Sequence, residues 1–309
     1  MQRAAIVAAT VFAAAAAAPA PAQAAFPGRD GRIAYTSDWF PDDCGHACEE
    51  EVVGLDTIRP DGTGRRPIGR CGRRSVDCSE AEPAWSPDGR RLAFSHDSSI
   101  WVMRADGSHA HRVIRRAATP SWSPDGRHIV FAKARGEHSW ISIMRADGTH
   151  RHRISPTGFN LDPSWSVRGL IAYTHHPQDY KDQLSIVMRR PDGRLVSRFE
   201  RRYNVANPDF SPDGARIAFE RYVQDDRISI WTSRPDGSHM RRVAADGLAP
   251  AWSPSGRSIA YSSPVLPSRR REIYVTRRDG SGAHRVGPSP RRKSDRRGDY
   301  GEPSWQPLP

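Results

Sequence analysis

The stretch from Pro83 to Ser95, PAWSPDGRRLAFS, decides the fold because the chain repeats it. Further copies begin at four later prolines and read PSWSPDGRHIVFA from Pro120, PSWSVRGLIAYT from Pro163, PDFSPDGARIAFE from Pro208 and PAWSPSGRSIAYS from Pro250. A truncated copy, EPSWQPLP, ends the chain at residues 302–309. Each full copy places two short β-type runs on either side of a tight turn. In that turn Pro fixes φ, Asp bonds to nearby backbone and Gly takes the left-handed conformation.

A second turn signal follows each apolar run. It ends in Asp-Gly at Gly62, Gly107, Gly148, Gly193, Gly237 and Gly280. Between the two turns lies an apolar triplet such as Leu92-Ala93-Phe94 or Ile217-Ala218-Phe219. Each repeat therefore predicts four strands, A to D. Strand A carries the Pro and an aromatic residue, strand B carries the triplet, and strands C and D flank the second turn.

The spacing of the repeats predicts a β-propeller. The aromatic residues of strand A recur 37 to 53 residues apart, at Trp85, Trp122, Trp165, Phe210, Trp252 and Trp305. Four strands in a period of about 40–50 residues are typical of a propeller blade. Signals for strands B, C and D occur six times, but the first unit has no strand A and the last strand A stands alone. We therefore expect residues 302–307 to pair beside residues 31–37, which closes a six-bladed, all-β ring and removes two sheet edges.

The first 24 residues have the composition of a signal peptide. Arg3 precedes an apolar run over residues 4–18, and Ala22-Gln23-Ala24 fits a small-x-small cleavage site. The sequence thus predicts an exported chain, periplasmic or secreted, whose propeller spans residues 25–309. A retained N-terminal anchor is the alternative, although the run is short for a membrane span of about 20 residues. No later segment of the mature chain is apolar enough to be transmembrane.

Four cysteines, Cys44, Cys48, Cys71 and Cys78, fit an oxidising compartment. They predict two disulfides with three possible pairings. A zinc site is the alternative, because His46 lies between the first two thiols. The cysteine spacings differ from the usual zinc-knuckle pattern, so we favour disulfides.

The formal net charge of +12 comes almost entirely from arginine. A basic surface attracts nucleic acid without specificity. The sequence therefore predicts no specific nucleic-acid partner, and we expect a monomer.

The repeated PxWSPDGxxIAY unit resembles the propeller of TolB and its relatives, a WD40-like repeat family. The ending EPSWQPLP resembles the closing strand of that propeller, and the resemblance covers nearly all of residues 26–309. It implies a TolB-like propeller in a bacterial envelope setting. TolB carries an α/β domain before its propeller, whereas here the signal-like segment leads directly into the repeats. The resemblance therefore implies the fold and leaves the role in the Tol system aside.

One position in each repeat could bind a ligand. The residue before the strand A proline should lie at the mouth of the central channel; it is Glu82, Thr119, Asp162, Asn207, Ala249 and Glu302 in successive repeats. Carboxylates at Glu82, Asp162 and Glu302, with the Asn207 amide, would suit a hard cation such as Ca²⁺. A hydrated polar rim without a bound metal is the alternative that we favour, so no cofactor is assigned.

The connections from B to C and from D to A should share one face of the ring, and they hold the irregular sequence. Binding residues commonly lie on such loops. Further candidates on this loop face are His175, His176, Asp179, Asp182, Asp225 and Asp226. A solvated loop is the simpler interpretation of each. All four cysteines also fall in loops of this face.

The sequence contains no G-x-S-x-G, H-E-x-x-H or P-loop motif. We therefore favour a protein-binding or scaffold module that uses its loop face, with a protein partner in the cell envelope or outside the cell. The alternative is a lactonase-like or phosphatase-like hydrolase that holds a metal on Glu82, Asp162 and Glu302.

Overall fold

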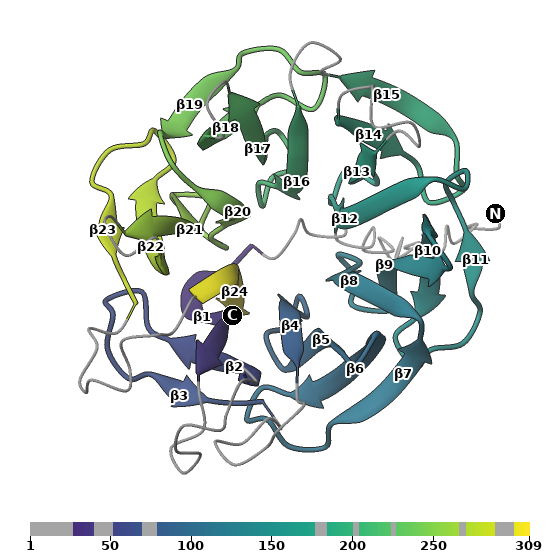
Figure 1. Ribbon diagram of the computed structural model, residues 1–309, viewed down its shortest axis with the longest axis horizontal. Coiled ribbons are helices and arrows are strands. Elements are labelled where there is room, and N and C mark those ends of the chain that lie inside the picture. The colour runs from purple at the N-terminus through teal and green to yellow at the C-terminus, as the bar shows by residue number, and fades with distance from the viewer. Residues whose placement is uncertain are drawn as a thin grey trace, which may run out of the picture.

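The computed structural model describes residues 27–39, 52–69, 79–176, 184–199, 204–223, 227–265, 270–287 and 300–309. These residues form six four-stranded antiparallel sheets that stand around a common axis (Figure 1). The predicted six-bladed, all-β propeller is therefore confirmed. Within these ranges there is no helix with the length and apolarity needed to cross a membrane.

Successive blades follow one another along the chain. The strands are β1 (Arg29–Trp39), β2 (Val52–Ile58), β3 (Arg66–Pro67), β4 (Glu80–Trp85), β5 (Arg91–His96), β6 (Ser99–Arg104), β7 (His111–Arg115), β8 (Ala117–Trp122), β9 (His128–Arg135), β10 (His138–Arg145), β11 (His152–Arg153), β12 (Phe159–Trp165), β13 (Ile171–His176), β14 (Ser185–Arg189), β15 (Leu195–Phe199), β16 (Val205–Phe210), β17 (Ile217–Val223), β18 (Arg227–Ser233), β19 (Arg241–Ala244), β20 (Leu248–Trp252), β21 (Ser258–Val265), β22 (Arg270–Arg277), β23 (His284–Arg285) and β24 (Tyr300–Leu308). Blade 1 has the order β24-β1-β2-β3, and blades 2 to 6 begin at β4, β8, β12, β16 and β20. In every blade strand A lies nearest the axis and strand D lies outermost (Figure 1).

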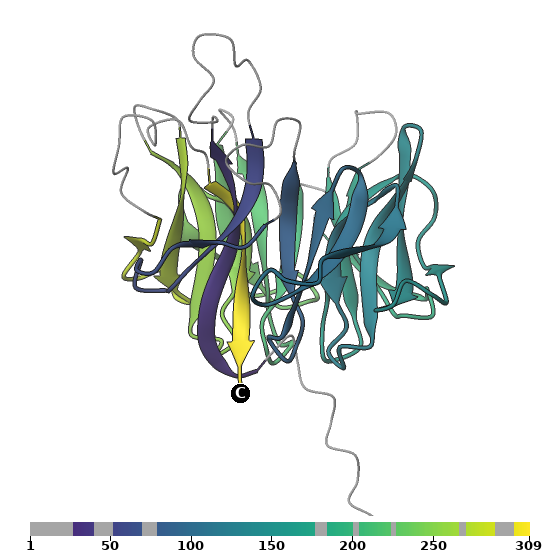
Figure 2. The same cartoon turned by 90° about the horizontal axis from the view of Figure 1, so that it is seen from below.

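The last strand closes the ring as predicted. β24 pairs antiparallel with β1, with Trp305 opposite Ile33, and the two strands lie side by side in Figure 2. The Trp305 indole donates a hydrogen bond to the Ala251 carbonyl of blade 6 (3.1 Å). The Gln306 side-chain amide donates to the Gly89 carbonyl of blade 2 (2.9 Å). β24 therefore connects three blades.

The strand A aromatic residues pack between neighbouring sheets. Trp122 of blade 3 is 1% exposed and packs with Ala93 of blade 2 and Phe131 of its own blade. Its indole nitrogen donates to the Ala84 carbonyl of blade 2 (3.0 Å). Each blade thus covers an apolar face that its neighbour could not bury alone, which is why the repeats come as a ring.

The two Asp-Gly turns have separate tasks. In the first, the Asp88 carboxylate accepts hydrogen bonds from the Ser86 hydroxyl (2.5 Å) and the Arg90 backbone N–H (3.1 Å). In the second, Gly107 has φ +87°, and a Cβ there would lie 2.5 Å from the Ile68 carbonyl oxygen of blade 1. The second turn therefore needs glycine both for its backbone angle and for the contact between blades.

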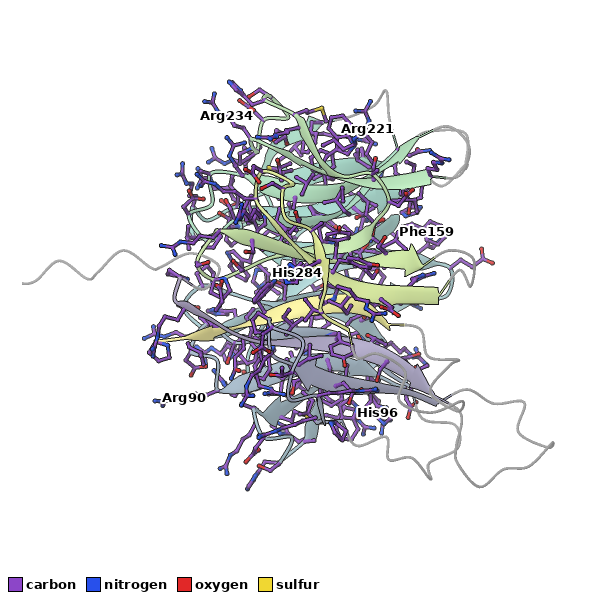
Figure 3. All side chains as sticks on the ribbon, turned by 90° about the vertical axis from the view of Figure 1, so that its left-hand side faces the viewer. Arg90, His96, Phe159, Arg221, Arg234 and His284 are labelled. Carbon is purple, nitrogen blue, oxygen red and sulfur yellow. The ribbon has the colours of Figure 1, made fainter. Side chains whose placement is uncertain are left out.

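The turns define the two ends of the ring. We call the end with the A–B and C–D turns the turn face and the opposite end the loop face. Figure 3 shows Arg90 and Arg234 at the turn face, with His96, Phe159 and Arg221 at the loop face.

Candidate functional site

A cavity of about 690 Å³ lies on the propeller axis and is lined by strand A of all six blades. All six positions before the strand A prolines line it. We call these the rim positions; they are Glu82, Thr119, Asp162, Asn207, Ala249 and Glu302. Other lining residues, such as Tyr222, Ile228, Leu248 and Arg271, lie near the loop-face ends of their strands.

The rim positions share an unusual backbone. Each has φ between +47° and +55°, although none is glycine. The A–B ladder shifts register at the same place, for example between Ala81 and Ala84 in blade 2. A left-handed non-glycine residue costs roughly 1–2 kcal/mol. At five of the six positions the backbone N–H donates to a side chain of the neighbouring blade, and this bond helps to hold the strained backbone.

Side chains of blades 1 to 3 hold the rim N–H groups of the following blade. Glu302 accepts from the backbone N–H of Glu82 (2.8 Å), and Glu82 accepts from that of Thr119 (2.6 Å). The Thr119 hydroxyl in turn accepts from the N–H of Asp162 (3.3 Å). Each rim residue therefore fixes the next one around the cavity.

In blades 4 and 5 the neighbouring strand B supplies the acceptor. The Thr174 hydroxyl accepts from the N–H of Asn207 (3.0 Å). Glu220 accepts from the N–H of Ala249 (2.7 Å) and from the side-chain amide of Asn207 (2.6 Å). Ala249 has no polar side chain, so the relay of side chains ends at blade 6.

Sequence reasoning missed Glu220. It follows the apolar triplet of strand B, where the other repeats have Thr36, Ser95, Ala132, Thr174 and Ser262. A carboxylate at a position otherwise held by small residues was the available signal. The side chain is 1% exposed, and burial raises its pKa.

Asp209 is a second missed residue. It stands between the proline and the aromatic residue of strand A, where the other copies have Ala or Ser. Its carboxylate accepts from the Trp252 N–H of blade 6 (2.8 Å) and from the Ser164 hydroxyl of blade 4 (3.2 Å). It thus bridges three blades, and burial raises its pKa to about 6.

The cavity is acidic although the protein is basic. Among the described lining residues the charged side chains are Glu82, Asp162, Asp209, Glu220, Glu302 and a lone cation, Arg271. Burial, and then the charge of Glu302, raises the pKa of Glu82 to about 6. Burial and the neighbouring carboxylates raise the pKa of Asp162 well above its ordinary value. Ionising all of these groups at once is therefore unfavourable, and a bound cation would relieve the repulsion.

A metal site at the rim, the alternative to a hydrated polar rim, gains no support from the side-chain geometry. Within the described ranges, no three His, Cys, Asp or Glu side chains are grouped in a way that could hold a metal ion. One oxygen of Glu302 already accepts bonds from Thr36 and Glu82, and one oxygen of Glu82 accepts from Ser95 and Thr119. The hydrated polar rim stays a prediction, with Ca²⁺ binding as its alternative.

The loop-face candidates lie apart from the cavity or outside the described residues. His175 and His176 end β13, and neither lines the cavity. The His175 ring nitrogen Nδ1 is 2.8 Å from the Asn160 side-chain oxygen, and burial lowers the pKa of both histidines. Outside the described residues lie Asp179, Asp182, Asp225, Asp226, Cys44, Cys48, Cys71 and Cys78. The disulfides therefore stay a prediction.

Comparison with known proteins identifies the fold. Residues 72–199 match the family model of the TolB beta propeller domain. TolB from Acinetobacter baumannii has a TM-score of 0.72 at 19% identity, with 90% of this chain and 67% of that chain covered. A putative TolB from Agrobacterium tumefaciens has a TM-score of 0.64 at 17% identity, with coverages of 90% and 100%. A chain of the Nidogen/Laminin complex has a TM-score of 0.63 at 13% identity, with coverages of 89% and 98%. A search of curated proteins found no match.

Proposed function

From the premise that this chain is a TolB-like β-propeller, we propose that it is an exported protein-binding or scaffold module. Its contact surface is the loop face, and its partner is a protein in the cell envelope or outside the cell. The partner places a basic segment over the acidic cavity. Export rests on the signal-like composition of residues 1–24.

The observation that carries this proposal is that the cavity holds more charge than its architecture needs. Thr119 and Thr174 accept the N–H of the next rim residue with an uncharged hydroxyl. Glu302, Glu82 and Glu220 perform the same task with carboxylates. A buried carboxylate costs stability when it ionises, and such costs are commonly retained for binding.

The charge distribution favours a basic partner. Five carboxyl groups and Arg271 line the cavity of a chain whose formal net charge is +12. A concave site lined by one sign of charge concentrates the electric field and attracts the opposite charge. The fold itself also accommodates partners, since a similar fold occurs in the Nidogen/Laminin complex.

A charge-neutralising variant tests the proposal without removing hydrogen bonds. In Glu82 and in Glu302 a single oxygen accepts both bonds, so the remaining oxygen of Gln can accept them in the E82Q/E302Q variant. The matched control, D106N/D236N, removes two carboxylates from exposed C–D turns on the turn face. Immobilised residues 25–309 and both variants are each incubated with envelope extract.

The proposal predicts a protein that is retained by the wild type and the control but released from E82Q/E302Q. The retained protein should carry a basic segment that, as a synthetic peptide, competes for binding. Equal retention by all three proteins would contradict it.

A further inference from the structure

A second cavity lies on the outer side of the ring, where blades 2 and 3 meet. Its volume is about 270 Å³, and it is lined by Arg112, Val113, Ile114, Arg115, Lys133 and Arg151. Blade 2 contributes β7, and blade 3 contributes β9 and the residue before β11. We call it the basic groove, because every charged side chain that lines it is a cation.

Two of these cations, Arg151 and Lys133, stand at positions that vary between the repeats. Arg151 occupies a position held by Arg65 in blade 1 and by Ala110, Met240 and Ala283 in blades 2, 5 and 6, and both Ala110 and Met240 pack against the neighbouring blade. Lys133 occupies a position held by Ser37 and Ser263 in blades 1 and 6, by His96 and His175 in blades 2 and 4, and by Arg221 in blade 5. In the sequence, blade 3 alone carries Lys or Arg at both positions, and the small residues that other blades hold there show that the fold requires neither charge.

The cations of the groove have no acidic partner. In blade 1 the residue equivalent to Arg151 is Arg65, whose guanidinium forms an ion pair with Asp56 (2.6 Å). Arg151 instead donates to the Gly148 carbonyl (2.6 Å), and the Lys133 ammonium donates to the Arg115 carbonyl. Across the described ranges, no ion pair joins a carboxylate to any cation of the groove. Its positive charge is left for a ligand.

Lys133 lies close enough to other cations for their charges to act on it. Burial, followed by the charges of Arg151 and Arg116, lowers its pKa. An anion bound among these side chains would offset the repulsion between the cations. The planar guanidinium of arginine suits tetrahedral oxyanions, because two of its parallel N–H groups can each donate a hydrogen bond to a phosphate oxygen.

We propose that the basic groove between blades 2 and 3 binds a phosphate group. The groove is smaller than the roughly 300–1,000 Å³ pockets that take drug-sized molecules. One phosphate group therefore enters it, either as the free ion or carried on a larger molecule such as a lipid headgroup. This site lies between β7 of blade 2 and β9 of blade 3, shares no lining residue with the axial cavity, and does not depend on the function proposed above.

The test uses residues 25–309 with inorganic phosphate as the probe, and isothermal titration at constant ionic strength as the readout. K133S/R151A introduces residues that other blades already carry at these positions, so we expect it to fold. The control, R241Q/R242Q, removes two exposed cations from β19. The wild type and the control should bind phosphate, and K133S/R151A should bind at least about tenfold more weakly. Equal affinities, or no binding by the wild type, would overturn the proposal.

Two further arms complete the test. If K133S/R151A does not fold, R151A alone is judged by the same criterion. Sedimentation with phosphatidylglycerol vesicles, compared with phosphatidylcholine vesicles, identifies the source of the phosphate. Vesicle binding that K133S/R151A abolishes assigns a lipid headgroup, whereas binding of inorganic phosphate alone assigns the free ion.

Discussion

Replacing Asp209 by Asn should change how the stability of the propeller depends on pH. Burial between three blades raises the pKa of Asp209 from 3.8 to about 6. At 1.36 kcal/mol per pKa unit, this difference corresponds to about 3 kcal/mol. Because the folded state holds the proton more tightly than the unfolded state, this stabilisation is fully present below about pH 4. It is lost as the pH rises through about 6.

D209N removes this titration and leaves a side-chain oxygen that can accept the Trp252 N–H, which lies 2.8 Å from the carboxylate. The free energy of unfolding of D209N minus that of the wild type should therefore rise by up to about 3 kcal/mol between pH 4 and pH 8. Guanidinium unfolding at closely spaced pH values measures this difference.

The matched control is D236N in an exposed turn, where hydrogen bonds from Ser238 lower the pKa of the carboxyl. In that variant the difference should fall as the pH rises, because the wild-type carboxylate stabilises the turn above its unfolded pKa. A D209N difference that is flat, or that falls with pH, would refute the assigned pKa shift of Asp209.

Three further changes have expected outcomes. G107A should lower the free energy of unfolding by more than about 2 kcal/mol, because a Cβ would contact the Ile68 carbonyl. G136A, which has open space around it, should lower it by only about 1 kcal/mol. Similar losses for the two variants in urea unfolding would contradict the contact between blades. Deleting residues 302–309 should abolish cooperative melting, because β1 loses its partner strand; a wild-type melting curve would argue against closure by β24. Ca²⁺ added after chelator treatment should leave the melting temperature unchanged. If Ca²⁺ instead raises it, and alanine at Glu82, Asp162 and Glu302 removes that rise, the metal-dependent hydrolase is favoured.

The architecture could be predicted because each blade repeats its own chemistry. Six Asp-Gly turns and six strand A aromatics give the period, and the isolated EPSWQPLP shows how the ring closes. The rim positions were predictable for the same reason, since each directly precedes a proline.

The bonding around the cavity could not be predicted, because it depends on how neighbouring blades are placed. The residue types Glu, Thr and Ala do not predict a left-handed backbone, although the rim positions that they occupy have one. Glu220 and Asp209 reach the adjacent blade from positions whose equivalents hold small residues, so their role becomes clear only when the sheets stand side by side. Comparing each repeat position for a single odd residue would have identified both.

The most direct test of the proposed function asks which face of the propeller meets the partner. A photo-crosslinking residue is placed in living cells at Ile228, which lines the cavity, or at Arg90, which lies on the turn face. We expect a discrete crosslinked protein from Ile228 that disappears when E82Q/E302Q is introduced, and none from Arg90. Crosslinks from Arg90 alone, or an Ile228 crosslink that persists in E82Q/E302Q, would contradict it.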